Sequence, residues 1–209
     1  MNAELTNTSS CATLLGTLLM QSPKSGPVAE AAKGLCAMDL ESEWPFGSPG
    51  ELTEVAALLE KARNYSPVQL DREFHHLFVG PHHLDAPPWG SAYLDAESVV
   101  FGDSCVELIR WMRANGIALH EDGSREPADQ IGRMLVLLSW ICENEPVLAD
   151  DYLELHLLTW APKYFERLKT AASDPFYRAL AMLTTITIRD IANQRGLTAE
   201  WTWQEADSL

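Results

Sequence analysis

A signal for the start of a helix recurs along this chain and restricts its fold more than any other sequence feature. Serine or aspartate followed by proline precedes an apolar, helically spaced stretch at Ser48-Pro49, Ser66-Pro67 and Asp174-Pro175. Proline suits the first helical position because its missing N–H would have no partner there, and the preceding side chain caps the free amides. At the two serines, a glutamate or glutamine three residues later completes a capping box. These signals predict helices that begin at defined residues.

Apolar residues spaced three and four positions apart predict the face that each helix buries. The expected buried stripes are Leu52, Val55 and Leu59; Leu70, Phe74, Leu77 and Phe78; and Phe176, Leu180, Leu183, Thr187 and Ile191. Further helices are expected around residues 14–19 and 27–38, from Ser104 to Asn115-Gly116, from Pro127 through Ile141, and after Asp150 with a division at Pro162. No alternating pattern indicates a strand, and Ser98 to Phe101 is too short to carry a sheet. The sequence therefore predicts an all-α, single-domain compact helical bundle or globule over residues 1–209.

Length and residue usage indicate a cytoplasmic protein that needs neither disulfide bonds nor a structural metal ion for stability. A chain of 209 residues buries enough surface to be stable alone, and its apolar stretches fall far short of the roughly 20 residues of a membrane span. The first ten residues have no basic segment, which argues against a secretory signal. Four cysteines lie tens of residues apart without a CxxC pair, a pattern that favours free thiols over a zinc site or disulfides.

The chain is strongly acidic, with 30 acidic and 15 basic residues and a net charge of -15. Such a field repels nucleic acid and anionic membranes, so neither is an expected partner, and a charged partner should be basic. Between Glu121 and Glu154, nine carboxylates and two basic residues give a local net charge of -7. A peptide that carries guanidinium groups would gain charge-assisted hydrogen bonds there. The alternative is an acidic surface that only keeps the protein in solution.

One segment, Gly80 to Asp95, is expected to be an ordered loop rich in proline and aromatic residues. Its three prolines and two glycines argue against a helix, whereas Trp89 and Tyr93 are large residues for a loop without a role. Ordered loops of this composition often line a binding surface. Equally, Trp89 and Leu94 are suited to cover the core.

Catalytic and metal-binding signals are weak. The doublets His75-His76 and His82-His83 could form a metal site with Asp85, but adjacent helical residues point about a hundred degrees apart. Glu126 and Asp129 resemble an acid/base pair, yet carboxylates are ordinary in a first helical turn. The sequence also lacks a phosphate-binding loop, a dinucleotide fingerprint and a nucleophile elbow. We therefore expect no catalytic residue, metal or cofactor.

Several motifs in combination resemble the TorD/DmsD family of redox-enzyme maturation chaperones, with the DmsD branch the most similar. They are Leu77-Phe78-Val79-Gly80-Pro81, Ala86-Pro87-Pro88-Trp89-Gly90-Ser91, Tyr93-Leu94-Asp95, Glu97-Ser98-Val99, Phe101-Gly102-Asp103-Ser104, Glu126-Pro127-Ala128-Asp129, His156-Leu157-Leu158-Thr159-Trp160 and Asp174-Pro175-Phe176-Tyr177. The resemblance covers nearly the whole chain.

The resemblance implies an all-α protein without catalysis that binds the twin-arginine leader of a molybdopterin-dependent reductase, of the dimethyl sulfoxide or trimethylamine N-oxide reductase type. Binding would delay Tat export until the cofactor is loaded, and components of the Tat translocon are further candidate partners. The implied leader-binding residues are Phe74, Leu77, Phe78, Pro88, Trp89, Glu126, Asp129 and Gln130.

The chain departs from the family pattern at two of these positions. Gln130 stands where the family usually has histidine, so a contribution from a titrating imidazole would be lost. Phe74 replaces a tryptophan and keeps an aromatic face without an indole donor. The alternatives are a small metal- or nucleotide-dependent enzyme, which no motif supports, and a purely structural interaction subunit.

Overall fold

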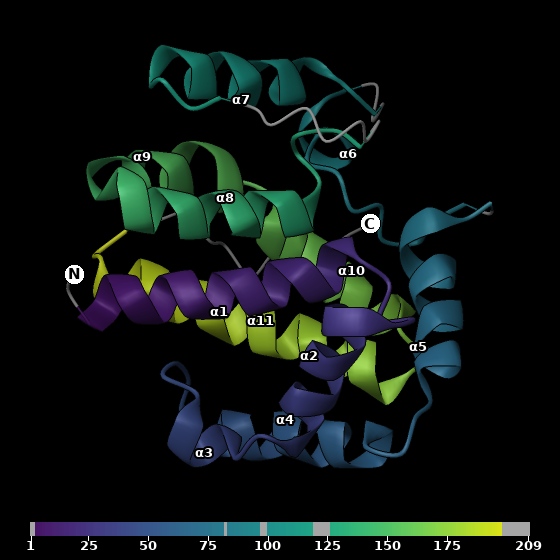
Figure 1. Ribbon diagram of the computed structural model, residues 1–209. Coiled ribbons are helices and arrows are strands. Elements are labelled where there is room, and N and C mark those ends of the chain that lie inside the picture. The colour runs from purple at the N-terminus through teal and green to yellow at the C-terminus, as the bar shows by residue number, and fades with distance from the viewer. Residues whose placement is uncertain (1–2, 82, 97–99, 119–125, 198–209) are drawn as a thin grey trace, which may run out of the picture.

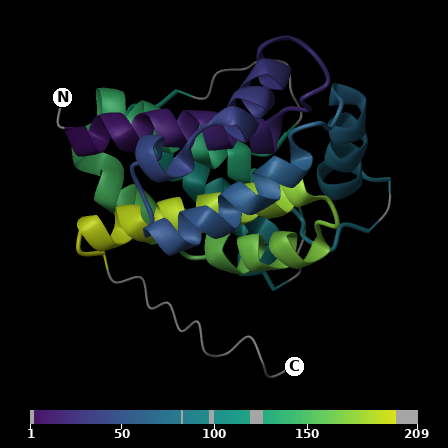
Figure 2. The ribbon, with the colours of Figure 1, turned by 90° about the horizontal axis from the view of Figure 1, so that it is seen from below.

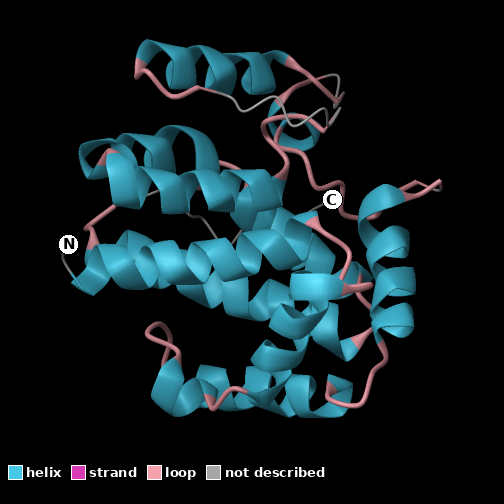
Figure 3. Ribbon diagram, viewed as in Figure 1, coloured by secondary structure: helices cyan, strands magenta, loops and turns pink. Residues whose placement is uncertain are grey.

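The computed structural model describes residues 3–81, 83–96, 100–118 and 126–197, and the regular elements of this part are helices (Figure 3). In chain order they are α1 (Ala3–Met20), α2 (Gly26–Ala37), α3 (Leu40–Glu43), α4 (Pro49–Ala62), α5 (Pro67–Phe74), the π-helix η1 (His75–Val79), α6 (Ser91–Leu94), α7 (Asp103–Ala114), α8 (Ile131–Asn144), the 3-10 helix η2 (Pro146–Leu148), α9 (Ala149–Tyr152), the π-helix η3 (Leu153–Leu157), α10 (Ala161–Ala171) and α11 (Pro175–Gln194). The predicted all-α class is confirmed.

Helices α1, α8 and α11 form the centre of the molecule (Figure 1). α1 packs along α8, while α4 and α10 pack on α11. Figure 1 shows α7 beyond α8 and α9 on one side, and α3 with α4 on the opposite side. The view in Figure 2 shows α4, α10 and α11 running across the same face. The predicted stripe of α11 is buried along its whole length, from Phe176 to Ile191.

The three predicted helix starts are confirmed. Ser48 and Ser66 are the N-caps of α4 and α5, and both form the predicted capping boxes. Asp174 caps α11 and accepts hydrogen bonds from the backbone N–H groups of Phe176 (2.7 Å) and Tyr177 (3.3 Å). These caps satisfy amides that would otherwise have no partner in the first turn.

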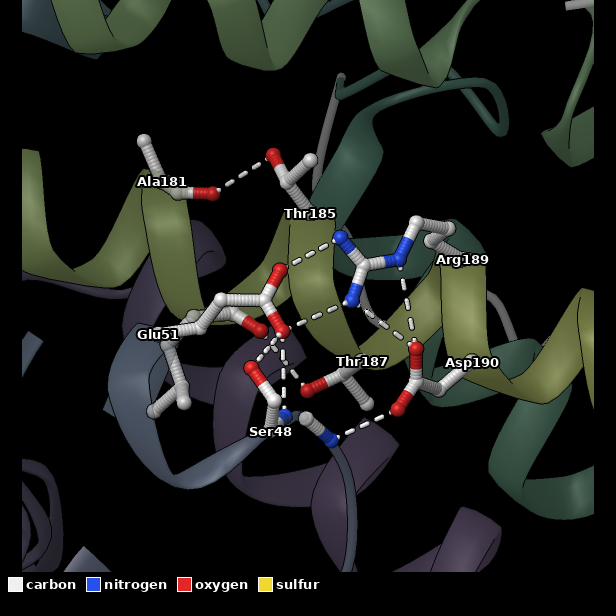
Figure 4. Close-up of polar contacts among 9 residues, drawn as sticks. Ser48, Glu51, Ala181, Thr185, Thr187, Arg189 and Asp190 are labelled. Atoms are coloured by element: carbon white, nitrogen blue, oxygen red, sulfur yellow. Dashed lines mark hydrogen bonds and ion pairs between the residues drawn. The ribbon is translucent and has the colours of Figure 1, made fainter. Parts of the chain in front are cut away.

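The capping glutamate of α4 also binds the last helix (Figure 4). The guanidinium of Arg189 donates to Glu51 at 2.6 and 3.2 Å, and its neighbour Asp190 accepts a 2.6 Å hydrogen bond from the backbone N–H of Gly47. Hydrogen bonding to Arg189, and then to Ser48, lowers the pKa of Glu51 to about 2. The start of α4 is therefore held to α11 by a two-pronged ion pair.

The crossing of α1 with α8 depends on two glycines. A Cβ atom placed on Gly132 would lie 2.5 Å from the carbonyl oxygen of Gly16, and one on Gly16 would lie 2.7 Å from that of Gly132. Neither helix has space for a larger side chain at this point. The glycines thus set how closely the two central helices approach.

Two predicted helix starts were wrong, and one short helix was not predicted. α8 begins at Ile131 instead of Pro127, because Gln130 is its N-cap and residues 127–130 form a turn before it. α6 lies within the segment expected to be free of helix, since no proline follows residue 88 there. α7 begins at Asp103, and the Asp95 carboxylate accepts hydrogen bonds from the backbone N–H and hydroxyl of Ser104.

Other predictions lie only partly within the described residues. Residues of the notable motifs that fall outside them are His82, Glu97, Ser98, Val99, Glu121, Asp122 and Arg125. The predicted division at Pro162 is confirmed, because η3 ends at Leu157 and α10 begins at Ala161. In the described ranges, no helix combines the length and the apolar character that a bilayer span requires.

Candidate functional site

Two of the motifs that are distant in sequence lie side by side just before α8. The backbone N–H of Gly90 donates to the carbonyl oxygen of Asp129 at 3.1 Å, and that of Ile131 donates to the carbonyl of Pro88 at 2.8 Å. These bonds form an isolated antiparallel bridge between Trp89 and Gln130. The Pro-Pro-Trp-Gly loop and the Glu-Pro-x-Asp turn therefore form one structural unit.

The indole ring of Trp89 is oriented by this unit. Its Nε1–H donates a 2.8 Å hydrogen bond to the Glu126 carboxylate, and the side chain is half-buried. A large, half-buried aromatic ring whose polar edge is satisfied is typical of a contact point for a peptide. Pro88, immediately before it, is buried. The structure thus brings together Pro88, Trp89 and Glu126, as the resemblance implied.

Asp129 is the most unusual polar residue of the unit, because this acidic residue is only 3% exposed. Oδ2 accepts a 2.7 Å hydrogen bond from the backbone N–H of Ser91 at the start of α6. Oδ1 is buried and has no hydrogen-bond partner among the described residues. An unsatisfied carboxylate oxygen is costly to bury, and it is a strong acceptor for an incoming donor.

Cys105 is a close titratable neighbour of that carboxylate. Burial, and then the negative charge of Asp129, raises the pKa of the Cys105 thiol to about 11. The thiol is therefore protonated and neutral at neutral pH, so it adds no negative charge beside Asp129.

Gln130 has a structural role that requires no charge. Its side-chain carbonyl accepts a 2.9 Å hydrogen bond from the backbone N–H of Arg133, and its amide donates at 3.0 Å to the carbonyl of Leu19. Gln130 therefore caps α8 and links it to the end of α1. Because an amide carries both a donor and an acceptor, glutamine performs both tasks at once.

Phe74, Leu77 and Phe78 occupy a different environment. They lie in α5 and η1 and are only 5–6% exposed. The ring of Phe78 lies 4.9 Å from that of Phe74 and 5.6 Å from that of Tyr177 in α11. In this structure they are part of the core rather than the wall of an open groove, which agrees with the predicted buried stripe of that helix.

The acidic segment does not form a single surface. Glu143 accepts a hydrogen bond from Ser9 of α1, and Asp150 forms an ion pair with Arg195 at the end of α11. Glu126 and Asp129 are the two of its described carboxylates that belong to the loop–turn unit. Charge along the sequence alone therefore overstated the extent of the acidic region at the site.

A pocket beside Asp129 was not predicted. It is small, with a cavity volume of about 50 Å³, partly open to solvent, and Asp129, His156 and Trp160 are among its lining residues. The sequence signal was the His156-Leu157-Leu158-Thr159-Trp160 motif, to which no role was assigned. Because His156 lies in the π-helix η3, helical periodicity could not have indicated the direction of its side chain.

The described residues offer no set of three histidine, cysteine or acidic side chains placed to hold a metal ion. His75 Nδ1 lies 2.8 Å from the backbone carbonyl oxygen of Asp71 and 3.3 Å from its carboxylate, contacts that an ordinary helix-end hydrogen bond explains. His82, which belongs to the second doublet, is outside the described ranges.

Comparisons with known proteins agree with one another. The family model described as "Nitrate reductase delta subunit" matches residues 48–166, more than half of the chain. The Tat proofreading chaperone DmsD of Salmonella typhi is 38% identical over 178 residues, which cover 85% of each protein. The chaperone protein TorD of Psychrobacter sp. is 29% identical over 110 residues, covering 48% of this chain and 49% of its own.

Among solved structures, a crystal structure from Archaeoglobus fulgidus described as a "Putative Redox Enzyme Maturation Protein" has a TM-score of 0.52 with this chain. The match covers 84% of this chain and 91% of that protein at 18% identity. At this identity, the likeness concerns the fold alone.

Proposed function

The chain belongs to the nitrate reductase delta subunit family, where DmsD and TorD are among its relatives, and from this premise we propose that it is a Tat proofreading chaperone. In this proposal, it binds the twin-arginine leader of a molybdopterin-dependent reductase precursor and delays export until the cofactor is in place. The expected client is a reductase of the dimethyl sulfoxide or trimethylamine N-oxide type. The resemblance to the TorD/DmsD family found in the sequence is confirmed.

The observation that carries the proposal is the buried carboxylate of Asp129, with one oxygen that lacks a partner, in the same loop–turn unit as the half-buried Trp89. A twin-arginine leader presents guanidinium groups followed by an apolar stretch. A guanidinium donates several hydrogen bonds in one plane, and a carboxylate oxygen without a partner is a suitable acceptor for them. Trp89, in the same loop–turn unit, supplies an apolar surface for the neighbouring leader residues.

Phe74, Leu77 and Phe78 contribute to this function through the core in our proposal. Phe78 packs against Tyr177 of α11, and the burial of all three residues holds α5 and η1 on the core. Pro88, Trp89, Glu126, Asp129 and Gln130 are the residues that we assign to leader binding in the structure as it stands.

The proposal places the protein in the cytoplasm, since a leader has to be bound before the Tat translocon receives it. Contact with translocon components would then occur at the moment of transfer. The relatives are named as chaperones, and we propose accordingly that this chain has no catalytic activity of its own. Its net charge of -15 suits a basic leader peptide.

The experiment that tests this function uses a purified reductase catalytic subunit in two forms, one with its twin-arginine leader and one without it. The proposal predicts a stable complex with the first form in size-exclusion chromatography and none with the second. As a control, a fusion of the leader to an unrelated soluble protein should also bind. Equal binding of the two reductase forms, or binding of neither, would exclude leader recognition as the function.

A further inference from the structure

Two residues that line the same pocket each carry a buried polar atom without a partner. These atoms are Oδ1 of Asp129 and Nε2 of His156, and neither has a hydrogen-bond partner among the described residues. Buried polar atoms in folded proteins almost always have partners, so these two are available to accept hydrogen bonds from a ligand. Both atoms are acceptors when the carboxylate is ionised and the imidazole is neutral with its proton on Nδ1.

The environment of His156 keeps its imidazole neutral. Burial lowers the pKa of His156 below its usual value. The ring of Trp111, on α7, lies 5.2 Å from the imidazole in an edge-to-face arrangement and fixes its orientation. π-helical turns such as η3 are frequent at functional sites, because they redirect side chains out of the α-helical pattern.

The remaining walls of the pocket favour a cation on an apolar stem. Leu108, Met134 and Trp160 form apolar sides, and Glu107 places an exposed carboxylate among the lining residues. No lysine or arginine is among the described residues that line it. Two acidic groups without a compensating base attract positive charge, and the apolar sides suit methylene groups.

Exposed apolar side chains surround the entrance. Leu94 of α6 and Leu155 of η3 line the pocket and are 44% and 59% exposed. Large aliphatic side chains at this exposure, next to a polar pocket, are typical of a surface that another chain covers. A ligand with a cationic side chain and apolar neighbours would satisfy both the pocket and its rim.

We infer that this pocket, the guanidinium slot, is formed by Glu107, Asp129, His156 and Trp160 and receives the side chain of one arginine of the leader. The inference rests on the proposed function and deepens it. Asp129 Oδ1 and His156 Nε2 each accept one N–H of the guanidinium, and Glu107 binds it from the solvent side. Leu94 and Leu155 then contact the apolar residues of the leader.

A guanidinium fits this slot better than an ammonium for a geometric reason. Its five N–H groups lie in one plane, so it can reach acceptors on separate elements at once, here the turn before α8 and η3. It is also more weakly hydrated, so it loses less hydration in a pocket with apolar sides. An ammonium would lose more hydration and would reach fewer of these acceptors.

The test is isothermal titration of the full-length protein with leader peptides in which one arginine at a time is replaced by citrulline. Citrulline keeps the shape of arginine but carries no charge. In the wild-type protein, we expect citrulline at one of the two positions to weaken binding by about tenfold or more. Glu107→Gln should weaken binding of the native leader about threefold, because exposed charge pairs contribute modestly.

The matched control for Glu107→Gln is Glu154→Gln, which removes the same charge from an exposed position of η3 outside the pocket lining. It should leave unchanged within error both the affinity for the native leader and the citrulline penalty, which is the factor by which citrulline weakens binding. His156→Phe keeps the ring but removes the acceptor and should weaken binding of the native leader about tenfold. The citrulline penalty should shrink in both Glu107→Gln and His156→Phe, since each removes a partner of the same guanidinium.

The inference is overturned if the native leader binds but the citrulline penalty is the same in wild type, Glu107→Gln and His156→Phe. It is likewise overturned if Glu154→Gln matches Glu107→Gln, because only net charge would then matter. Circular dichroism establishes whether His156→Phe remains folded, and the exposed Glu107→Gln decides the outcome if it does not. Absence of any binding by the native leader would contradict the proposed function itself.

Discussion

The indole nitrogen of Trp89 donates a 2.8 Å hydrogen bond to the carboxylate of Glu126 and so joins the proline-rich loop to the acidic turn before α8. This bond directs the apolar face of the ring, while the backbone bridge between Trp89 and Gln130 sets its position. The two motifs act together because each fixes the geometry of the other. A substitution in one motif should therefore change the geometry of the other.

Trp89→Ala should weaken leader binding by ~1–3 kcal/mol and leave the fold intact, because a half-buried loop aromatic that anchors a peptide behaves as a hot spot. Trp89→Phe, which keeps the ring and loses the bond to Glu126, should have a smaller effect. Leader titration combined with a melting curve measures both quantities. If Trp89→Ala binds normally, or if it unfolds, the side chain covers the core and does not contact the leader.

Gly132→Ala should destabilise the protein by about 1–3 kcal/mol, because the new methyl group would meet the backbone of Gly16 across the α1–α8 crossing. Urea denaturation measures this difference. The matched control is Gly34→Ala on α2, where the methyl group would meet no atom within 4 Å. That substitution should stabilise the protein by about 0.4–1 kcal/mol. Equal effects of the two substitutions would mean that the crossing tolerates a wider separation.

The ion pair of Glu51 with Arg189 predicts a pH-dependent contribution to stability. The folded-state pKa of Glu51 is about 2, below its usual value of 4.5. A depressed carboxyl pKa stabilises the fold above about pH 4.5, and this contribution disappears as the pH falls toward 2.

Accordingly, Glu51→Gln should lower Tm by about 2–4 °C at pH 7, the effect of a partly exposed pair in a chain of this length. The difference from wild type should shrink between pH 4.5 and 2. Glu54→Gln, at an exposed position of the same helix, is the control and should show no such trend. Differential scanning calorimetry over this range checks the prediction, which a pH-independent difference would contradict.

Dialysis against a chelator should change neither Tm nor leader binding, since the histidines of the first doublet are exposed and His75 is paired with Asp71. Metal analysis before and after dialysis accompanies the melting curves. A fall in Tm that zinc restores would support the alternative of a metal-dependent enzyme.

The helix starts were predictable because capping is local. Ser48, Ser66 and Asp174 each satisfy amides within three residues, so sequence spacing contains the necessary information. The start of α8 was not predictable in this way. Gln130 is the cap because its amide also reaches Leu19 in α1, a contact between residues that are distant in sequence. Local pattern favoured Pro127, and the tertiary contact determined the outcome.

The candidate site was predictable only in part for a similar reason. Trp89, Glu126 and Asp129 stood out through their motifs, and the structure brings them together. His156 did not stand out as a site residue. A π-helical turn sets the direction of its side chain, and the lack of a partner for its Nε2 can be seen only in the folded structure.

The most direct test of leader recognition is a set of four calorimetric titrations. Wild type and Asp129→Asn are each titrated with the twin-arginine leader and with the same leader carrying two lysines. Wild type should bind the arginine leader about tenfold or more tightly than the lysine leader, since lysine lacks the planar donor set. Asp129→Asn should reduce that ratio toward one, because the buried oxygen that receives the guanidinium has lost its charge. A coupling energy indistinguishable from zero, with both leaders bound equally by wild type, would mean that Asp129 never meets an arginine and only supports α6 through Ser91.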